Sequence, residues 1–329
     1  MKAWVSGPSP GLEHLDVKEI ALPKRDADHL LVRVSHAALN YSDLLMVADT
    51  YQVRPPRPFV VGQELAGIVE DAPEGSAFKP GDAVASKVLW GGFAEYALVR
   101  QDMAIRVPEG FSLSQAAALP VSYTTALVAL DTCARLTPAD TVMIHAAAGG
   151  VGLAAVEIAA ANGATIIATA GSQEKLETAK AHGAHHLVCY RDSDWVDQVK
   201  SITGGRGANV ILDPVGGEIG ENSLRCIAHD GRYLIVGFSS GAMQKLAPHR
   251  LLLKRASAIG VYWNHDTDAA LLAGLQTKLE GLIAEGHINP LVDERHSIGN
   301  LPEALDDLAN RRIQGKAVLN ADASKGAWA

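Results

Sequence analysis

Short apolar segments and longer segments with helical periodicity alternate along the chain from residue 141 to about residue 262. Each apolar run has the length of a buried strand, and such alternation predicts a parallel sheet covered by helices on both faces. The expected strands are Thr141–Ala146, Thr165–Ala170, Leu187–Tyr190, Asn209–Asp213, Tyr233–Val236 and Ala256–Tyr262. The expected helices between them are Val151–Ala161, Gln173–Ala181, Asp192–Thr203 and Ile219–Ala228.

A different pattern precedes this region, where short runs alternate apolar and polar residues between Pro and Gly. This pattern predicts the short strands of a barrel-like fold. The runs are His29–Val34, Ala66–Val69, Ala83–Ser86 and Phe93–Val99. Ser112 and Gln115 then form a capping box that begins a helical lead-in over Ala116–Leu130, interrupted by Pro120.

The end of the chain returns to a mixed pattern after a long predicted helix at Asp268–Glu285. A helix at Pro302–Asn310 and a strand at Ala317–Leu319 are expected there. We therefore predict a barrel domain that begins with residues 1–115, a nucleotide-binding domain over residues 116–262, and a return to the barrel domain over residues 263–329. A chain of 329 residues is long enough to form two domains.

The segment TVMIHAAAGGVGL, residues 141–153, leads from a strand through a turn of small residues into a helix. Gly149, Gly150 and Gly152 would let backbone N–H groups approach a pyrophosphate, and the positive end of the helix would face that anion. An ordinary tight turn is the alternative, because the segment departs from a strict GxGxxG at its first glycine. The strand that follows, after Asn162-Gly163 ends the helix, favours dinucleotide binding.

The second strand indicates which dinucleotide binds. Sites for NAD usually carry Asp or Glu at the end of this strand, where the carboxylate holds the ribose 2′-hydroxyl. This chain has Gly171-Ser172 there, followed by Lys175. Ser172 could simply cap the next helix and Lys175 could be a solvated surface residue, but together with the missing acid they favour NADPH. Glu174 is expected to face solvent at the helix start.

Charge and cysteine content narrow the partners and the compartment. The formal net charge of −8 opposes non-specific binding to nucleic acid or to an anionic membrane. We see no targeting or membrane-spanning pattern, and three widely spaced cysteines suggest a reducing compartment, so we expect a cytoplasmic protein. No metal site is expected: adjacent His185 and His186 would point to opposite faces of a strand, and His145 is interpreted as structural.

Several motifs occur in an order and spacing that carry a family resemblance. They are Asn40-Tyr41-Ser42-Asp43, the Pro58–Val69 segment with Gln63-Glu64, HAAAGGVG at 145–152, Asp213–Gly217, Gly237–Gly241 and Gly315–Leu319. With these motifs the chain resembles the medium-chain dehydrogenase/reductase superfamily and, within it, the zinc-free, zeta-crystallin-like NADPH:quinone oxidoreductases. The resemblance implies a GroES-like β-barrel catalytic domain with an inserted Rossmann domain.

Departures from the zinc-dependent alcohol dehydrogenases of that superfamily suggest the chemistry. Those enzymes have Cys where this chain has Asn40, and Gly-His-Glu where it has Gly62-Gln63-Glu64. Their four-cysteine structural zinc lobe also has no counterpart, because no cysteine precedes Cys133. Without a zinc-polarised carbonyl, hydride delivery to an electron-poor conjugated acceptor is the easiest chemistry.

The resemblance also implies roles for particular residues around a cleft between the two domains. Asn40, Thr125, Phe238 and Ser239 are expected near the nicotinamide end of NADPH. Gly149, Gly150 and Val151 are expected at the pyrophosphate, and Ser172, Lys175 and Tyr190 around the 2′-phosphate. Tyr51 matches a position that faces the substrate, where it either donates a proton or only forms the wall of the cleft. An Asx-turn is the structural alternative for Asn40.

Our leading hypothesis is a zinc-independent, NADPH-dependent reductase of a quinone or related conjugated carbonyl. An enoyl or alkenal reductase is the alternative within enzymes, since the loops that shape the acceptor pocket cannot be read from sequence. A non-catalytic, crystallin-like protein that binds nucleotide or RNA is a further alternative. A homodimer is expected, with the strand near residues 256–262 as the joining edge.

Overall fold

The computed structural model describes residues 1–328 of the chain, and these divide into two compact units. Unit 1 consists of Met1–Val121 together with the described residues from Pro290 onward, and unit 2 consists of Ser122–Asn289. The first unit is therefore built from both ends of the chain. The boundaries between the two units lie after residues 121 and 289. The sequence pattern predicted domain boundaries after residues 115 and 262.

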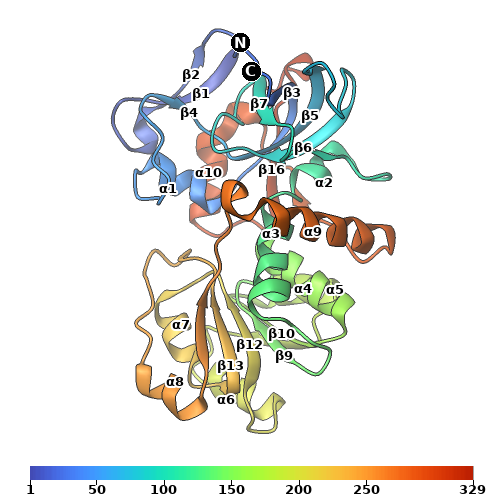
Figure 1. The fold of residues 1–329 in the computed structure, drawn as a ribbon. Coiled ribbons are helices and arrows are strands. Elements are labelled where there is room, and N and C mark those ends of the chain that lie inside the picture. The colour runs from blue at the N-terminus through green and yellow to red at the C-terminus, as the bar shows by residue number, and fades with distance from the viewer. Residues whose placement is uncertain (329) are drawn as a thin grey trace. The chain divides into compact units, whose positions relative to one another are not determined.

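Unit 1 is a β fold with two sheets (Figure 1). One sheet has the order β2-β1-β4, and the other has the order β15-β16-β3-β5-β6-β8 with β7 paired to β3. Its strands are β1 (Lys2–Ser6), β2 (Leu15–Glu19), β3 (His29–Ala38), β4 (Phe59–Val60), β5 (Glu64–Asp71), β6 (Ala83–Lys87), β7 (Tyr96–Arg100), β8 (Ile105–Arg106), β15 (Val292–Asp293) and β16 (Lys316–Asn320). Its α-helices are α1 (Tyr41–Val47), α2 (Leu113–Ala117) and α10 (Leu301–Ala309), and short 3-10 turns lie at Leu12–His14, Ile298–Asn300 and Ala323–Lys325.

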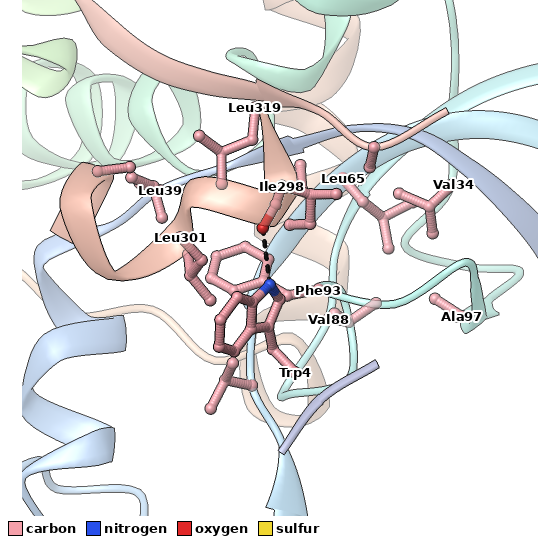
Figure 2. Packing of buried hydrophobic residues seen from close by; sticks show 14 of the residues in the cluster. Trp4, Val34, Leu39, Leu65, Val88, Phe93, Ala97, Ile298, Leu301 and Leu319 are labelled. Carbon is pink, nitrogen blue, oxygen red and sulfur yellow. Dashed lines mark hydrogen bonds between the residues drawn. The ribbon is translucent and has the colours of Figure 1, made fainter. Parts of the chain in front are cut away.

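The core of unit 1 joins the beginning of the chain to its end. Figure 2 shows Trp4 packed among buried residues that include Phe93 and Leu301. The Trp4 indole Nε1–H donates a hydrogen bond of 2.7 Å to the Ile298 carbonyl, which satisfies the ring's one polar atom inside the core. Strand β16 pairs antiparallel with β3, so the C-terminal segment completes the large sheet of unit 1.

Unit 2 is a six-stranded parallel sheet with helices packed against it, as the alternating pattern predicted (Figure 1). Its strand order β11-β10-β9-β12-β13-β14 is the doubly wound order typical of dinucleotide-binding domains. The strands are β9 (Thr141–Ile144), β10 (Thr165–Ala170), β11 (His186–Cys189), β12 (Ala208–Asp213), β13 (Ile227–Ile235) and β14 (Ser257–Gly260). The helices are α3 (Ser122–Leu127), α4 (Gly150–Asn162), α5 (Gln173–Ala181), α6 (Trp195–Ile202), α7 (Gly217–Ser223), α8 (Pro248–Lys254) and α9 (His265–Ala284).

Two predicted helices differ from the observed elements. The expected helix at Ile219–Ala228 ends at Ser223, and residues from Ile227 onward belong to β13. Ile227 pairs with Ala208 at the start of β12, so non-local pairing overrides the helical pattern there. The expected lead-in helix over Ala116–Leu130 is divided into α2, α3 and a π-helical segment at Val128–Cys133, because Pro120 lies between the first two.

Helix α9 belongs to unit 2, although the sequence pattern assigned its residues to the returning segment. Two contacts attach this part of the chain. The Trp263 indole N–H donates to the Thr125 hydroxyl at 3.1 Å, and the Lys278 ammonium pairs with Asp131. None of the helices within residues 1–328 combines the length and the apolar character needed to cross a membrane.

A single glycine sets how closely α4 approaches the turn before it, and this gives our first prediction. A Cβ atom on Gly152 would lie 2.2 Å from the Ala146 carbonyl oxygen and 2.8 Å from the Ala147 Cα. We predict that Gly152→Ala lowers the free energy of unfolding of unit 2 by about 1–3 kcal/mol, because the turn must shift to admit the methyl group. Urea unfolding followed by far-UV circular dichroism measures the change.

The matched control is Gly274→Ala in α9. A Cβ on the exposed Gly274 meets no atom within 4 Å, so this variant should be neutral or slightly more stable. Equal stability changes in the two variants would contradict the packing role of Gly152.

Candidate functional site

The turn between β9 and α4 presents backbone donors at a helix N-terminus. Ala146 has a φ of 48°, in the left-handed region that is strained for a residue with a side chain, and the Gly149 N–H donates to the Ala146 carbonyl at 2.9 Å. Helix α4 begins at Gly150, so the N–H groups of Gly150 and Val151 are among the first four, which have no acceptor within the helix. These two groups, rather than the N–H of Gly149, are available to an anion.

His145 lies beside this turn and is fully buried. One ring nitrogen, Nδ1, is 2.6 Å from the Thr169 hydroxyl, and Nε2 is 2.7 Å from the Ser223 hydroxyl. Burial lowers the pKa of His145, which favours the neutral ring, and the nearby Asp213 carboxylate opposes this shift only in part. His145 therefore connects β9 to β10 and α7, which is the structural role expected of it.

The end of β10 carries the residues predicted to surround a 2′-phosphate. Gly171 follows the strand, and Ser172 is the N-cap of α5 by its backbone, while its side chain makes no capping hydrogen bond. Lys175, half-buried, lies in the first turn of α5, and Glu174 is exposed as expected. Tyr190 lies nearby, since its N–H donates to the Ala170 carbonyl at 3.1 Å. The structure thus brings Ser172, Lys175 and Tyr190 together at the carboxyl ends of β10 and β11.

The loops after β12 and β13 are joined to each other. The buried Asp213 carboxylate accepts hydrogen bonds from the N–H groups of Val215 at 2.7 Å and Gly216 at 2.9 Å. The Ser239 N–H donates to the Pro214 carbonyl at 3.0 Å, and a Cβ on Gly216 would lie 3.1 Å from the Phe238 ring. Phe238 and Ser239 therefore lie at the carboxyl end of β13, beside the loop that follows β12. Ligands of open parallel sheets bind at these strand ends.

Asn40 is the N-cap of α1 in unit 1 and is only 8% exposed. Its Nδ2 donates to Glu64 Oε2 at 3.0 Å, and its Oδ1 accepts from Lys316 Nζ at 2.6 Å. The two partners fix the orientation of the amide, because only its oxygen can accept from an ammonium and only its nitrogen can donate to a carboxylate. Asn40 also forms a capping box with Asp43 at the start of α1, so its side chain has a local role as well as its bonds to distant residues.

Glu64 and Lys316 form an ion pair of 2.7 Å in which both side chains are at least nine-tenths buried. The other carboxylate oxygen of Glu64 accepts the Val121 N–H at 2.7 Å. We assigned neither residue a role from sequence, although both occur in the motifs that carried the family resemblance. Lys316 is distant from Asn40 along the chain, and only the pairing of β16 with β3 brings them together.

Asp43 adds a second buried carboxyl group beside Asn40. Its Oδ2 accepts the Asn40 backbone N–H at 2.7 Å, whereas its buried Oδ1 has no hydrogen-bond partner in the described part of the chain. Burial raises the pKa of Asp43 to about 7, and the Glu64 charge acts in the same direction, while the hydrogen bond from Asn40 and the Lys316 charge oppose it. Asp43 is thus a carboxyl group that titrates near neutral pH.

Tyr51 and Thr125 are the remaining predicted residues. Tyr51 lies in the bend after α1, is half-buried and packs against the core cluster of unit 1. Thr125, on α3 of unit 2, accepts the hydrogen bond from Trp263 described above.

Amide side chains occupy the two positions at which the resemblance implied that zinc ligands are replaced. The Asn40 amide is held by Glu64 and Lys316, and the Gln63 amide oxygen accepts a hydrogen bond from the Ser42 hydroxyl. Within residues 1–328, no three His, Cys, Asp or Glu side chains are grouped so that they could hold a metal ion. The Lys316 ammonium would also repel a cation bound at these oxygens.

Comparison with known proteins assigns a family model to each unit. Residues 26–109 match the alcohol dehydrogenase GroES-like domain, and residues 150–276 match the zinc-binding dehydrogenase family. Quinone oxidoreductase-like protein 2 of Rattus norvegicus is 35% identical over 311 residues, which cover 93% of this chain and 89% of that protein.

Two solved structures have nearly the same fold. The quinone oxidoreductase of Escherichia coli, complexed with NADPH, has a TM-score of 0.88 at 29% identity and covers 97% of this chain and 100% of its own. A structure described as an NAD-dependent alcohol dehydrogenase has a TM-score of 0.90, also at 29% identity, and covers 97% of this chain and 99% of its own.

The raised pKa of Asp43 predicts a pH dependence of stability. Its folded-state pKa of about 7 lies above the ordinary aspartate pKa of 3.8, so between these pH values the folded protein binds more protons than the unfolded chain. Stability should therefore fall as pH rises through this window. The Asp43→Asn variant, which can still accept the Asn40 N–H, should lack this loss and gain about 2–3 kcal/mol relative to the unmodified protein between pH 5 and pH 8.

Urea unfolding of both proteins at several pH values measures this difference directly. The comparison cancels titration elsewhere in the chain. A stability difference that stays constant from pH 5 to pH 8 would show that Asp43 does not titrate in this range.

Proposed function

Because the chain belongs to the medium-chain dehydrogenase/reductase superfamily, and within it to the quinone oxidoreductase family, we propose that it reduces a quinone with NADPH and without zinc. It is an oxidoreductase with the Rossmann and GroES-like units of that family. The observation that carries the proposal is the end of β10, where no acid follows the strand and Ser172, Lys175 and Tyr190 come together.

The residues of unit 2 fit NADPH. NADPH, when bound, supplies the hydride that reduces the acceptor. The N–H groups of Gly150 and Val151 are free to hold its pyrophosphate, and Gly149 leaves space for the approach. Ser172, Lys175 and Tyr190 would hold the 2′-phosphate, for which a cationic group replaces the acid of NAD sites.

We assign the nicotinamide end to Thr125, Phe238 and Ser239 of unit 2 and to Asn40 of unit 1. Beyond its bonds to Lys316 and Glu64, the Asn40 amide has a second N–H whose contact to the Ala38 carbonyl is long, at 3.5 Å, so this N–H can donate to a bound group. A fixed amide with remaining capacity suits the orientation of a bound group without reorganisation.

We propose that Tyr51 contributes to the acceptor site. Its packing against the core of unit 1 supports a role in shaping that site and excluding water. Donation of a proton by its hydroxyl to the reduced acceptor is the further role that the resemblance implies for this position.

The side chains that replace the ligands support the proposed zinc-independence. Amides of Asn40 and Gln63 are poor zinc ligands compared with thiolate and imidazole, and the Lys316 charge lies against Asn40. A quinone or another conjugated carbonyl accepts hydride without Lewis-acid activation, since the charge delocalises onto an oxygen that hydrogen bonds can stabilise. The negative net charge and the three free thiols support a small-molecule substrate and a reducing compartment such as the cytoplasm.

We predict NADPH oxidation in the presence of simple quinones, with activity unchanged by prior treatment with EDTA or 1,10-phenanthroline. Absorbance at the nicotinamide band measures it across a panel of quinones, enones and enals with both NADPH and NADH. Turnover of enals alone would favour the alkenal reductase. NADPH binding without turnover of any acceptor would favour the non-catalytic alternative and contradict the proposed activity.

We also propose that two copies associate through β14. Among the described strands, β14 is the outermost of its sheet and pairs with β13 alone, so its other side would otherwise expose unpaired backbone groups. Large apolar side chains are exposed close to it in sequence: Leu252 at 80%, Leu253 at 70% and Tyr262 at 66%. Such an exposed apolar patch favours a protein partner, here a second copy.

The substitution Ala258→Lys tests this dimer. In a two-fold interface the new ammonium of one chain lies near the same ammonium of the second chain, and the two charges repel each other. We therefore expect the dissociation constant of the dimer to rise about tenfold or more. Analytical ultracentrifugation measures this constant. Ala270→Lys, at an exposed position of α9, is the control and should leave association unchanged. A monomeric unmodified protein, or an unaffected Ala258→Lys dimer, would refute the proposed edge.

A further inference from the structure

Arg191 lies beside Gly171 at the carboxyl edge of the sheet of unit 2. Strands β10 and β11 are adjacent and parallel, with Ala170 opposite Cys189, so the residues that follow them are neighbours. A Cβ atom on Gly171 would lie 3.2 Å from Arg191 Nε and 3.5 Å from its Nη2. The same atom would lie 3.4 Å from the edge of the Tyr190 ring. The guanidinium and the ring therefore cover the place where a side chain at position 171 would begin.

The Arg191 side chain forms no hydrogen bond or ion pair with any residue in the part of the chain that the structure describes, and it is exposed. Many of the other arginines have carboxylate partners, such as Arg232 with Asp140 and Arg255 with Asp230. A guanidinium presents a planar fork of donors that matches a phosphate group in a bidentate manner. Arg191 therefore offers this fork unpaired, at the strand end beside Ser172 and Lys175.

The absence of a side chain at position 171 keeps the guanidinium unpaired. An Asp or Glu there, as in NAD sites, would lie close enough to Arg191 to form an ion pair. That carboxylate would neutralise the guanidinium and repel a phosphate. Gly171 and Arg191 thus act in the same direction, one by leaving space and the other by supplying charge.

We infer that Arg191 binds the 2′-phosphate of NADPH through its guanidinium and that Gly171 keeps this group available, so that the two residues determine cofactor specificity. The inference rests on the proposed function, because it requires that NADPH is the cofactor. It adds a residue that no sequence motif indicated: Arg191 follows a short strand, and nothing in the local pattern relates it to Gly171.

Binding of the fragments 2′,5′-ADP and 5′-AMP, measured by isothermal titration calorimetry, tests the inference without turnover. The two probes differ only by the 2′-phosphate. We expect Arg191→Ala to weaken 2′,5′-ADP binding about 10- to 100-fold, as for loss of a charge-assisted hydrogen bond, and to leave 5′-AMP binding unchanged. Arg191→Lys should retain part of the affinity, because an ammonium keeps the charge and loses the fork.

Two further variants complete the experiment. Arg206→Ala removes the same charge from an exposed loop that precedes β12, at the amino ends of the strands. This variant should leave the affinities for 2′,5′-ADP and for 5′-AMP unchanged. Gly171→Asp should weaken 2′,5′-ADP binding and shift the ratio of kcat/KM for NADPH and NADH toward NADH.

The outcomes separate the inference from the proposed function. If Arg191→Ala binds 2′,5′-ADP as tightly as the unmodified protein while Lys175→Ala does not, the role of Arg191 is refuted and NADPH specificity stands. If the unmodified protein binds 2′,5′-ADP no better than 5′-AMP, NADPH specificity itself is refuted, and the inference with it.

Discussion

Parallel strand direction is the constraint on which the candidate cofactor site depends. Because all strands of the unit 2 sheet run the same way, their carboxyl ends lie at one edge, and the loops that follow them meet there. The turn after β9, Gly171 after β10, Tyr190 and Arg191 after β11, and the joined loops after β12 and β13 all belong to this edge. The chain therefore gathers a helix N-terminus, a hydroxyl and two cationic side chains without any long excursion.

Unit 1 depends on a different kind of interaction, a set of charges buried in its core. Removing Glu64 and Lys316 from water is costly, and their attraction offsets the cost only because further hydrogen bonds satisfy their remaining atoms. Asn40 and the Val121 N–H provide those bonds to Glu64. The result is an amide held in one orientation. Asp43, beside them, has one carboxyl oxygen without a hydrogen-bond partner in the described part of the chain, and burial raises its pKa.

Overall fold does not distinguish the cofactors in this family. The chain superimposes about as well on an NAD-dependent alcohol dehydrogenase, with a TM-score of 0.90, as on an NADPH-bound quinone oxidoreductase, with a TM-score of 0.88. The backbone is common to both, so discrimination rests on a few atoms at the end of one strand. In our proposal those atoms are the missing side chain of Gly171 and the donors of Ser172, Lys175 and Arg191.

Local features of the chain were predictable from sequence because they depend on neighbouring residues. Strand Thr165–Ala170, helix Gln173–Ala181 and the Ser112 capping box agree residue by residue with the structure, since periodicity and capping act over a few positions. The glycine turn and the missing acid were also visible, and with them the family and the cofactor class. The start of β13 was not, because Ile227 becomes a strand residue only by pairing with β12.

Only the tertiary structure decided which distant side chains meet. Lys316 contacts Asn40 across 276 positions of sequence, and Arg191 lies over Gly171 because their strands are neighbours in the sheet. These contacts arise from strand order and register, which hydrophobic periodicity does not specify beyond each element. The sequence by itself therefore determined the fold class and the type of cofactor site, while the fold determined how the Asn40 amide is oriented and which arginine lies beside Gly171.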